Sequence, residues 1–415
     1  MTISHSVIAL GSLRGGIVMA MMIVANLVTV QHMGEISAVY AVVAAGAQIF
    51  GYALSNLALH ASKDADASPE MDSQIALACF SFWLCSALLI FGVGVFMETA
   101  VRVALFNKAV SPFSFQVGVL WLCGMTLEIM AVGIAMGRQK MPNMARFGVL
   151  QALLYLFVTP IAIIFLGYEG FIVLALLSYV SGLLIIFSMK PFKYRFYLYQ
   201  ISNKFINNLS SIIGPSILVA ISAVSLNLYI VNQITLFENS LYNLAVFAIC
   251  MQIFSIFSFI PQIIYTSFTS ILYNNFAASK NVYRHLLTGS FISLLSCGLA
   301  AAVMYATKNN ITLLFGQSYR EAGPTLVVVS LLLVVQGPLQ ILTQTYVLHD
   351  RQWYLTFISF LSSAAGMAYF ASQDAKTSVT MAASLLVAAL CRIALVLGDM
   401  AIVFYDDNSC RNHKK

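Results

Sequence analysis

Apolar residues run through the chain in twelve long stretches that short polar gaps separate. Most of the stretches hold at least about 20 residues, the length that a helix needs to cross a hydrocarbon core about 30 Å thick. They lie at about 6–30, 36–59, 75–97, 113–136, 147–166, 170–189, 210–233, 241–268, 286–306, 324–347, 353–371 and 378–404. The pattern therefore predicts an all-α integral membrane protein with about twelve transmembrane helices.

The longest internal gap, residues 190–209, is basic with interleaved aromatic residues and leaves six stretches on either side. We predict an N-terminal lobe at 1–189, a cytoplasmic linker at 190–209, a C-terminal lobe at 210–404 and a cytoplasmic tail at 405–415. Transporters often consist of two related six-helix halves. Two interpretations of the linker stay open: a helix that lies on anionic lipid headgroups, and a plain connector.

The positive charges indicate which side of the membrane each gap faces. With the N-terminus in the cytoplasm, the inner segments carry fourteen Lys and Arg residues and the outer ones carry five. This split follows the positive-inside rule and predicts that both termini are cytoplasmic. The gap at 61–74 fits least well, because it sets Lys63 against four acidic residues.

Composition excludes several classes of function. Apolar residues make up 60% of the chain and charged residues 9%, against roughly 25% charged in soluble domains. The net charge of +6 is spread over the gaps and does not argue for nucleic acid. No P-loop, paired-cysteine site or metal-binding motif is present, so we expect no metal and no cofactor. An ion gradient, of H⁺ or Na⁺, is one energy source that fits, and the short outer gaps argue against an enzyme.

Four charged residues lie inside the predicted spans: Arg14, Glu128, Arg392 and Asp399. Each costs about 2.5 to 3.5 kcal/mol at a helix centre, so each needs a partner or a wet cavity. Arg392 and Asp399 are seven residues apart and share one helix face. Two interpretations stay open: structural ion pairs, or a site in which Arg14 and Arg392 attract an anion while Glu128 or Asp399 takes up a proton or ion.

Four short stretches carry a resemblance to a known family. The outer segment LLFGQSYREAGP has Phe315, Gly316, Tyr319 and Ala322 in a Phe-Gly-x-x-Tyr-x-x-Ala pattern. The others are the charged turn at 349–352, the run MGEISAVY and the Gly-Arg turn at 137–138. Together they resemble the Wzx-type O-antigen and capsule flippases of the MOP superfamily, which also includes the MATE antiporters.

The resemblance implies a two-lobed, MATE-like transporter in the bacterial inner membrane. Its substrate would be an undecaprenyl-pyrophosphate-linked oligosaccharide, an O-antigen or other surface polysaccharide repeat unit, moved between leaflets by alternating access. A polysaccharide polymerase and a chain-length regulator would be its partners, beside the membrane lipids. Arg138, Lys140 and Arg146 on an inner turn would collect the pyrophosphate, and Arg14 and Arg392 would receive it deeper in.

Two other functions stay open. A MATE-like multidrug or cation antiporter would use Glu128 and Asp399 to bind cations, with the arginines in structural roles. A membrane polysaccharide polymerase would need a larger external acceptor site than the short outer gaps provide.

Overall fold

The computed structural model describes most of the backbone. The described residues are 2–63, 69–107, 109–137, 141–188, 203–237, 240–258, 282–343, 346 and 352–412. Side chains are described over a narrower set, which leaves out those of several helix ends and of Arg14.

Helices make up the regular structure of the described residues, and no strand occurs among them. The long helices are α1 (Thr2–Leu27), α2 (Val30–Lys63), α3 (Pro69–Phe96), α5 (Pro112–Gly137), α6 (Met141–Leu166), α7 (Ile172–Ser188), α8 (Asn203–Ile234), α9 (Ser240–Phe257), α11 (Val282–Leu313), α12 (Gly323–Leu342), α14 (Gln352–Ser372) and α15 (Ser378–Asn412). The short ones are α4 (Glu98–Phe106) and the 3-10 helices η1 (Gly167–Phe171) and η2 (Gln317–Ala322).

Each of the twelve predicted stretches overlaps one long helix. Within the described residues, eight helices are long and apolar enough to cross a membrane, or nine if the bent pair of α3 and α4 forms one span. Helices satisfy their own backbone hydrogen bonds, which is the requirement that a hydrocarbon environment imposes. The chain is therefore a multi-pass, all-α membrane protein, as the sequence predicts.

The helices gather into two compact units. The first holds Met1–Ile256 and Asn309–Gly323, and the second holds Phe257–Lys308 and Pro324–Lys415. These units do not test the lobes at 1–189 and 210–404, which stay a prediction, and most of the 190–209 linker lies outside the described residues.

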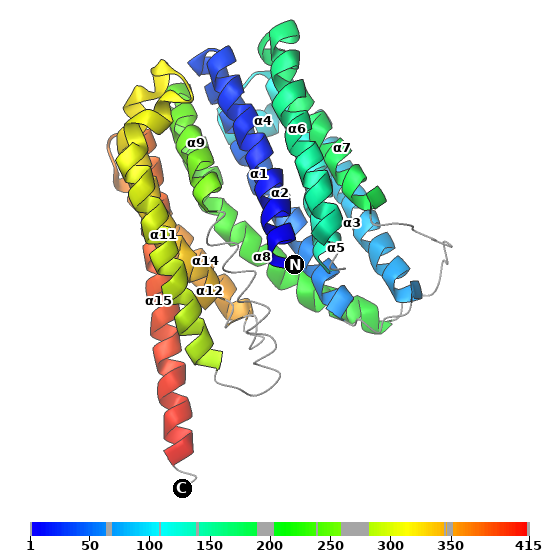
Figure 1. The fold of residues 1–415 in the computed structure, drawn as a ribbon, viewed down its shortest axis with the longest axis vertical. Coiled ribbons are helices and arrows are strands. Elements are labelled where there is room, and N and C mark those ends of the chain that lie inside the picture. The colour runs from blue at the N-terminus through cyan, green and yellow to red at the C-terminus, as the bar shows by residue number, and fades with distance from the viewer. Residues whose placement is uncertain are drawn as a thin grey trace. The chain divides into compact units, whose positions relative to one another are not determined.

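In the first unit, α1 packs along α6, α2 packs against α5 and α8, and α5 packs against α7 (Figure 1). Glycine permits the closest of these contacts. A Cβ atom on Gly16 of α1 would lie 2.5 Å from the Cα of Ala152 on α6. Close backbone approach of this kind is common between membrane helices, where small residues replace the hydrophobic effect as the basis of packing.

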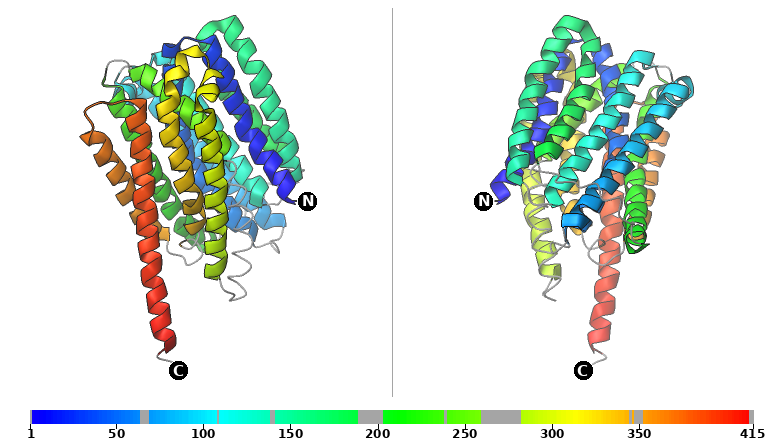
Figure 2. Two further views of the ribbon diagram at one scale, coloured as in Figure 1. Left: turned by 60° about the vertical axis from the view of Figure 1, so that its left-hand side comes forward. Right: turned by 90° about the vertical axis from the view of Figure 1, so that its right-hand side faces the viewer.

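In the second unit, α14 and α15 lie side by side (Figure 2, left). The end of α12, Tyr346 after it, the first half of α14 and the second half of α15 share an apolar cluster, which faces the cytoplasm in the predicted topology. Its buried members are Leu339, Leu342, Tyr346, Leu355, Ile358, Val396 and Met400. This cluster surrounds the helix face of α15 that carries the two charged residues of the last span.

Candidate functional site

Glu128 lies in the middle of the first unit, where α5, α6 and α7 meet. Its side chain is half-buried, and its Oε1 accepts a hydrogen bond of 2.8 Å from Nε2 of Gln151 on α6. Gln151 itself is 3% exposed. The carboxylate is therefore held by a neutral amide on the neighbouring helix, and the helix pair positions an ionisable group within the span.

The glycines near Glu128 bring helices together. A Cβ on Gly124 would lie 3.1 Å from the Ala175 carbonyl oxygen of α7, and a Cβ on Gly182 of α7 would lie 3.1 Å from the backbone nitrogen of Glu128. The small residue one turn before Glu128 thus lets α7 approach α5 closely.

Further polar groups surround this carboxylate. The hydroxyls of Tyr155 on α6 and Ser178 on α7 are 2.9 Å apart and both buried. Two other buried oxygen atoms, Oε1 of Gln151 and Oγ of Ser181, have no hydrogen-bond partner among the described residues. An unsatisfied buried polar atom costs about 1 to 3 kcal/mol, so such atoms are frequent where a ligand or ion binds.

Gln151, Tyr155 and Ser178 are uncharged, so the search for charges inside the spans does not mark them. A signal was present, because Gln151 and Tyr155 are four residues apart and so share one face of α6. Polar residues on one face of a transmembrane helix point toward protein or water.

Arg392 and Asp399 of α15 lie in the second unit. Arg392 donates a hydrogen bond from Nη2 to Oγ of Ser359 on α14, and Tyr346 donates its O–H to Oδ2 of Asp399 at 2.9 Å. Both side chains therefore point to the same face of α15, as the seven-residue spacing predicts, and that face packs on protein. Glu128 and Asp399 thus each accept a hydrogen bond from a neutral group, an amide and a phenol.

Three cationic candidates lie wholly or partly outside the described part of the chain. The backbone of Arg14 belongs to α1 but its side chain is not described, and Arg138 and Lys140 lie outside the described residues. Arg146 is exposed in the first turns of α6. The pyrophosphate-collecting role of the inner turn stays a prediction.

The outer segment that carries the Phe-Gly-x-x-Tyr-x-x-Ala pattern is packed into the first unit. Phe315, Tyr319 and Ala322 are each at most 1% exposed. Asn26 of α1 donates a hydrogen bond of 2.9 Å to the carbonyl oxygen of Leu314. Gly316 has φ +108°, a conformation that favours glycine, so this residue of the pattern has a backbone role. We call residues 309–323 the strap.

No protein-family model matches the sequence, and no curated protein matches it. Solved structures do match. An inward-facing multidrug resistance MATE family transporter of the MOP superfamily superposes with a TM-score of 0.70 and 13% identity, over 95% of this chain and 96% of that one. A eukaryotic MATE transporter gives 0.72 and 14%, over 96% and 94%. The fold is that of the MATE transporters.

A third structure with this MATE-like fold is the lipid II flippase MurJ in an inward closed conformation. It superposes with a TM-score of 0.66 and 12% identity, over 95% of this chain and 86% of MurJ. These three neighbours are transporters or flippases by their descriptions, and none of them is described as an enzyme. The MATE-like fold therefore occurs both in multidrug resistance transporters and in a lipid flippase.

Proposed function

We propose that this chain is a flippase that moves an undecaprenyl-pyrophosphate-linked oligosaccharide across the bacterial inner membrane by alternating access. The observation that carries the proposal is the MATE-like fold, which the chain shares with a lipid II flippase over nearly its whole length. Arginines inside the first and last spans add to it, because a pyrophosphate needs cationic partners.

The chemistry of the substrate explains why such a protein is needed. Sugar hydroxyls and a pyrophosphate lose their hydration in hydrocarbon, so a lipid-linked oligosaccharide cannot cross unaided. A transporter that opens a wet slot first to one side and then to the other spares the head group this transfer, while the lipid tail stays in the bilayer. A polysaccharide polymerase and a chain-length regulator would act on the product at the outer face.

Arg392 is the described cation best placed to bind the head group. Its guanidinium donates to Ser359, and a guanidinium carries a planar fork of donors that matches the oxygens of a phosphate. Arg14 would act with it from the first unit, after Arg138, Lys140 and Arg146 collect the substrate at the inner surface.

Glu128 is our candidate for coupling transport to an ion gradient, of H⁺ or Na⁺. Its carboxylate accepts a hydrogen bond from the amide nitrogen of Gln151, whose amide oxygen Oε1 lacks a partner in the described part of the chain. Carboxylate, amide and hydroxyl oxygens are groups that accept a proton or bind a hard cation. Asp399 is a second candidate in the other unit, and there the phenol of Tyr346 holds it.

Deletion of the gene tests the substrate. We expect lipid-linked repeat units to accumulate on the cytoplasmic face of the inner membrane and surface polysaccharide to disappear, measured on the same cells by mass spectrometry of lipid extracts and by labelling of sugars in oriented vesicles. Normal units and a normal surface would contradict the flippase assignment.

Replacing Arg392 with alanine tests the head-group site. We expect surface polysaccharide to fall at least tenfold, because one charge-assisted hydrogen bond to phosphate contributes about 1.5 to 3 kcal/mol. Arg320→Ala, at an exposed arginine of η2, is the matched control and should export normally. Protein level is followed by immunoblot of membranes. Wild-type export by Arg392→Ala at a normal level would exclude the head-group role.

A MATE-like multidrug or cation antiporter is the second candidate, and the two MATE neighbours favour it. Glu128 would then bind a protonated drug. A changed pattern of drug susceptibility on deletion, with intact surface polysaccharide, would select this function. Shortened polysaccharide chains with continued export of single units would instead indicate a polymerase.

A further inference from the structure

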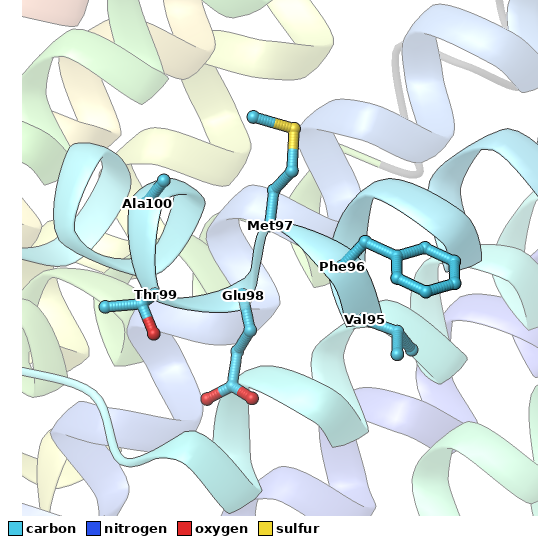
Figure 3. Close-up of a pocket in the computed structure, with 6 residues that line it drawn as sticks. All are labelled: Val95, Phe96, Met97, Glu98, Thr99 and Ala100. Carbon is cyan, nitrogen blue, oxygen red and sulfur yellow. The ribbon is translucent and has the colours of Figure 1, made fainter.

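The chain bends sharply where α3 ends. The helical segments Phe80–Phe96 and Glu98–Phe106 meet at an angle of 91° with Met97 between them. Residues 95–100, which we call the elbow, line an open hollow of about 430 Å³. Figure 3 shows that Met97 and Glu98 point in opposite directions from the break. An apolar and an acidic side chain thus diverge at one point of the chain.

The apolar side of the elbow continues the exposed surface of α3. Leu88 and Leu89 are 65% and 63% exposed, and Phe96 at the elbow is 89% exposed. On a membrane-crossing helix, large apolar side chains with such exposure face the lipid acyl chains. Continuity with this surface indicates that lipid also covers Phe96 and its neighbour Met97.

Contacts within the first unit hold α4 in its direction. Glu98 accepts a hydrogen bond of 3.1 Å from Gln116 of α5, and Arg102 donates one of 3.0 Å to the carbonyl oxygen of Val110. Asn232 of α8 donates from its side chain to the carbonyl oxygen of Ala104. Hydrogen bonds to α5, α8 and Val110 therefore stabilise the orientation of α4 at a right angle to α3.

The position of the elbow along the chain matches a membrane interface. Phe96 lies ten residues past the middle of the apolar stretch 75–97, which is about 15 Å along a helix at 1.5 Å per residue. Half of a hydrocarbon core about 30 Å thick is the same distance. Glu98 and Thr99 then follow at the depth where polar groups meet water and headgroups.

We propose that the elbow is a phospholipid-binding surface: Phe96 and Met97 insert at the boundary between acyl chains and headgroups, and α4 lies in the plane of the membrane at that depth. The leaflet is the outer one in the topology that the Lys and Arg distribution predicts. The elbow then fixes how deep the α3 end of the first unit sits in the bilayer. This inference does not depend on what the protein transports.

Spin-label depth measurements test the proposal. Single cysteines replace Phe96, Thr99, Ala100 and Ala104, all exposed, in a protein whose reactive native cysteines are replaced. The full-length protein is placed in nanodiscs of phosphatidylethanolamine and phosphatidylglycerol, and each nitroxide is probed with oxygen and with a water-soluble nickel chelate. Phe357 of α14, 62% exposed, serves as the acyl-chain reference, and Asp374 in the turn after α14 serves as the aqueous reference.

We expect the label at 96 to read as lipid-embedded near the interface, and the labels at 99, 100 and 104 to read a common depth within a few ångströms. A helix that continued along the membrane normal would instead change depth by about 1.5 Å per residue. Nickel accessibility at 96 equal to that at 374 would overturn the proposal, as would a steady change of depth from 96 to 104. Low access to both reagents would indicate a protein partner at the elbow and would also overturn it.

Discussion

Glu128→Gln is expected to abolish transport while the protein reaches the membrane in normal amount. Glutamine keeps a carbonyl oxygen that can accept the 2.8 Å hydrogen bond from Gln151, so the contact between α5 and α6 survives. The variant cannot take up a proton and carries no charge for a cation. We expect at least a hundredfold loss of export, measured as lipid-linked repeat units reaching the outer face in oriented vesicles under an imposed ion gradient.

Gln151→Ala separates coupling from packing at this site. It removes the donor but leaves the carboxylate, so it should weaken transport without eliminating it. Transport by Glu128→Gln at the wild-type rate would show that Glu128 only accepts a hydrogen bond. A variant that disappears from the membrane would be replaced in the assay by Glu128→Asp, which keeps the charge on a shorter side chain and should retain partial, gradient-dependent transport.

Gly34→Ala is expected to cause the largest loss of folded protein among the glycine substitutions. A Cβ on Gly34 of α2 would lie 2.1 Å from the carbonyl oxygen of Leu241 at the start of α9, a backbone atom that no rotamer change can move. Overpacking of this kind costs about 3 kcal/mol. The fraction of protein that stays monodisperse after heating in detergent should fall sharply. The midpoint temperature of this thermal denaturation should lie several degrees below that of the wild type.

Gly298→Ala in α11 is the matched control, because a Cβ there meets nothing within 4 Å. Alanine favours a helix over glycine by about 1 kcal/mol, so this variant should be as stable as the wild type or slightly more so. Equal melting of the two variants would show that α2 and α9 do not approach as closely as the structure has them.

The sequence predicts the helices well, because the length and hydrophobicity of a stretch are almost sufficient to identify a helix that crosses a bilayer. All twelve predicted stretches overlap helices of the described part of the chain, and the shared face of Arg392 and Asp399 follows from helical periodicity alone. The sequence does not predict the elbow, because residues 98–112 are interpreted as an outer gap between two spans. The pair Glu98 and Arg102, with a 3.9 Å ion pair at i,i+4, was the available signal for α4.

The site is predicted less completely, since partners on other helices depend on helix order and rotation, which one sequence does not fix. Glu128 stands out as a charge in an apolar run, but its partner Gln151 lies 23 residues away on another helix. For the same reason, a glycine in the sequence does not show whether the space beside it holds a cavity or a neighbouring helix. In the structure, α7 packs against Gly124.

The strap gives the connection between α11 and α12 an unusual mechanical property. Residues 309–323 belong to the first unit, whereas the chain on both sides, up to Lys308 and from Pro324, belongs to the second. The chain therefore leaves the second unit, enters the first and returns to the second within fifteen residues. The buried aromatic rings of Phe315 and Tyr319 anchor this short excursion, so the loop that the family-like pattern marks is a covalent tether between the two units, fixed at its middle.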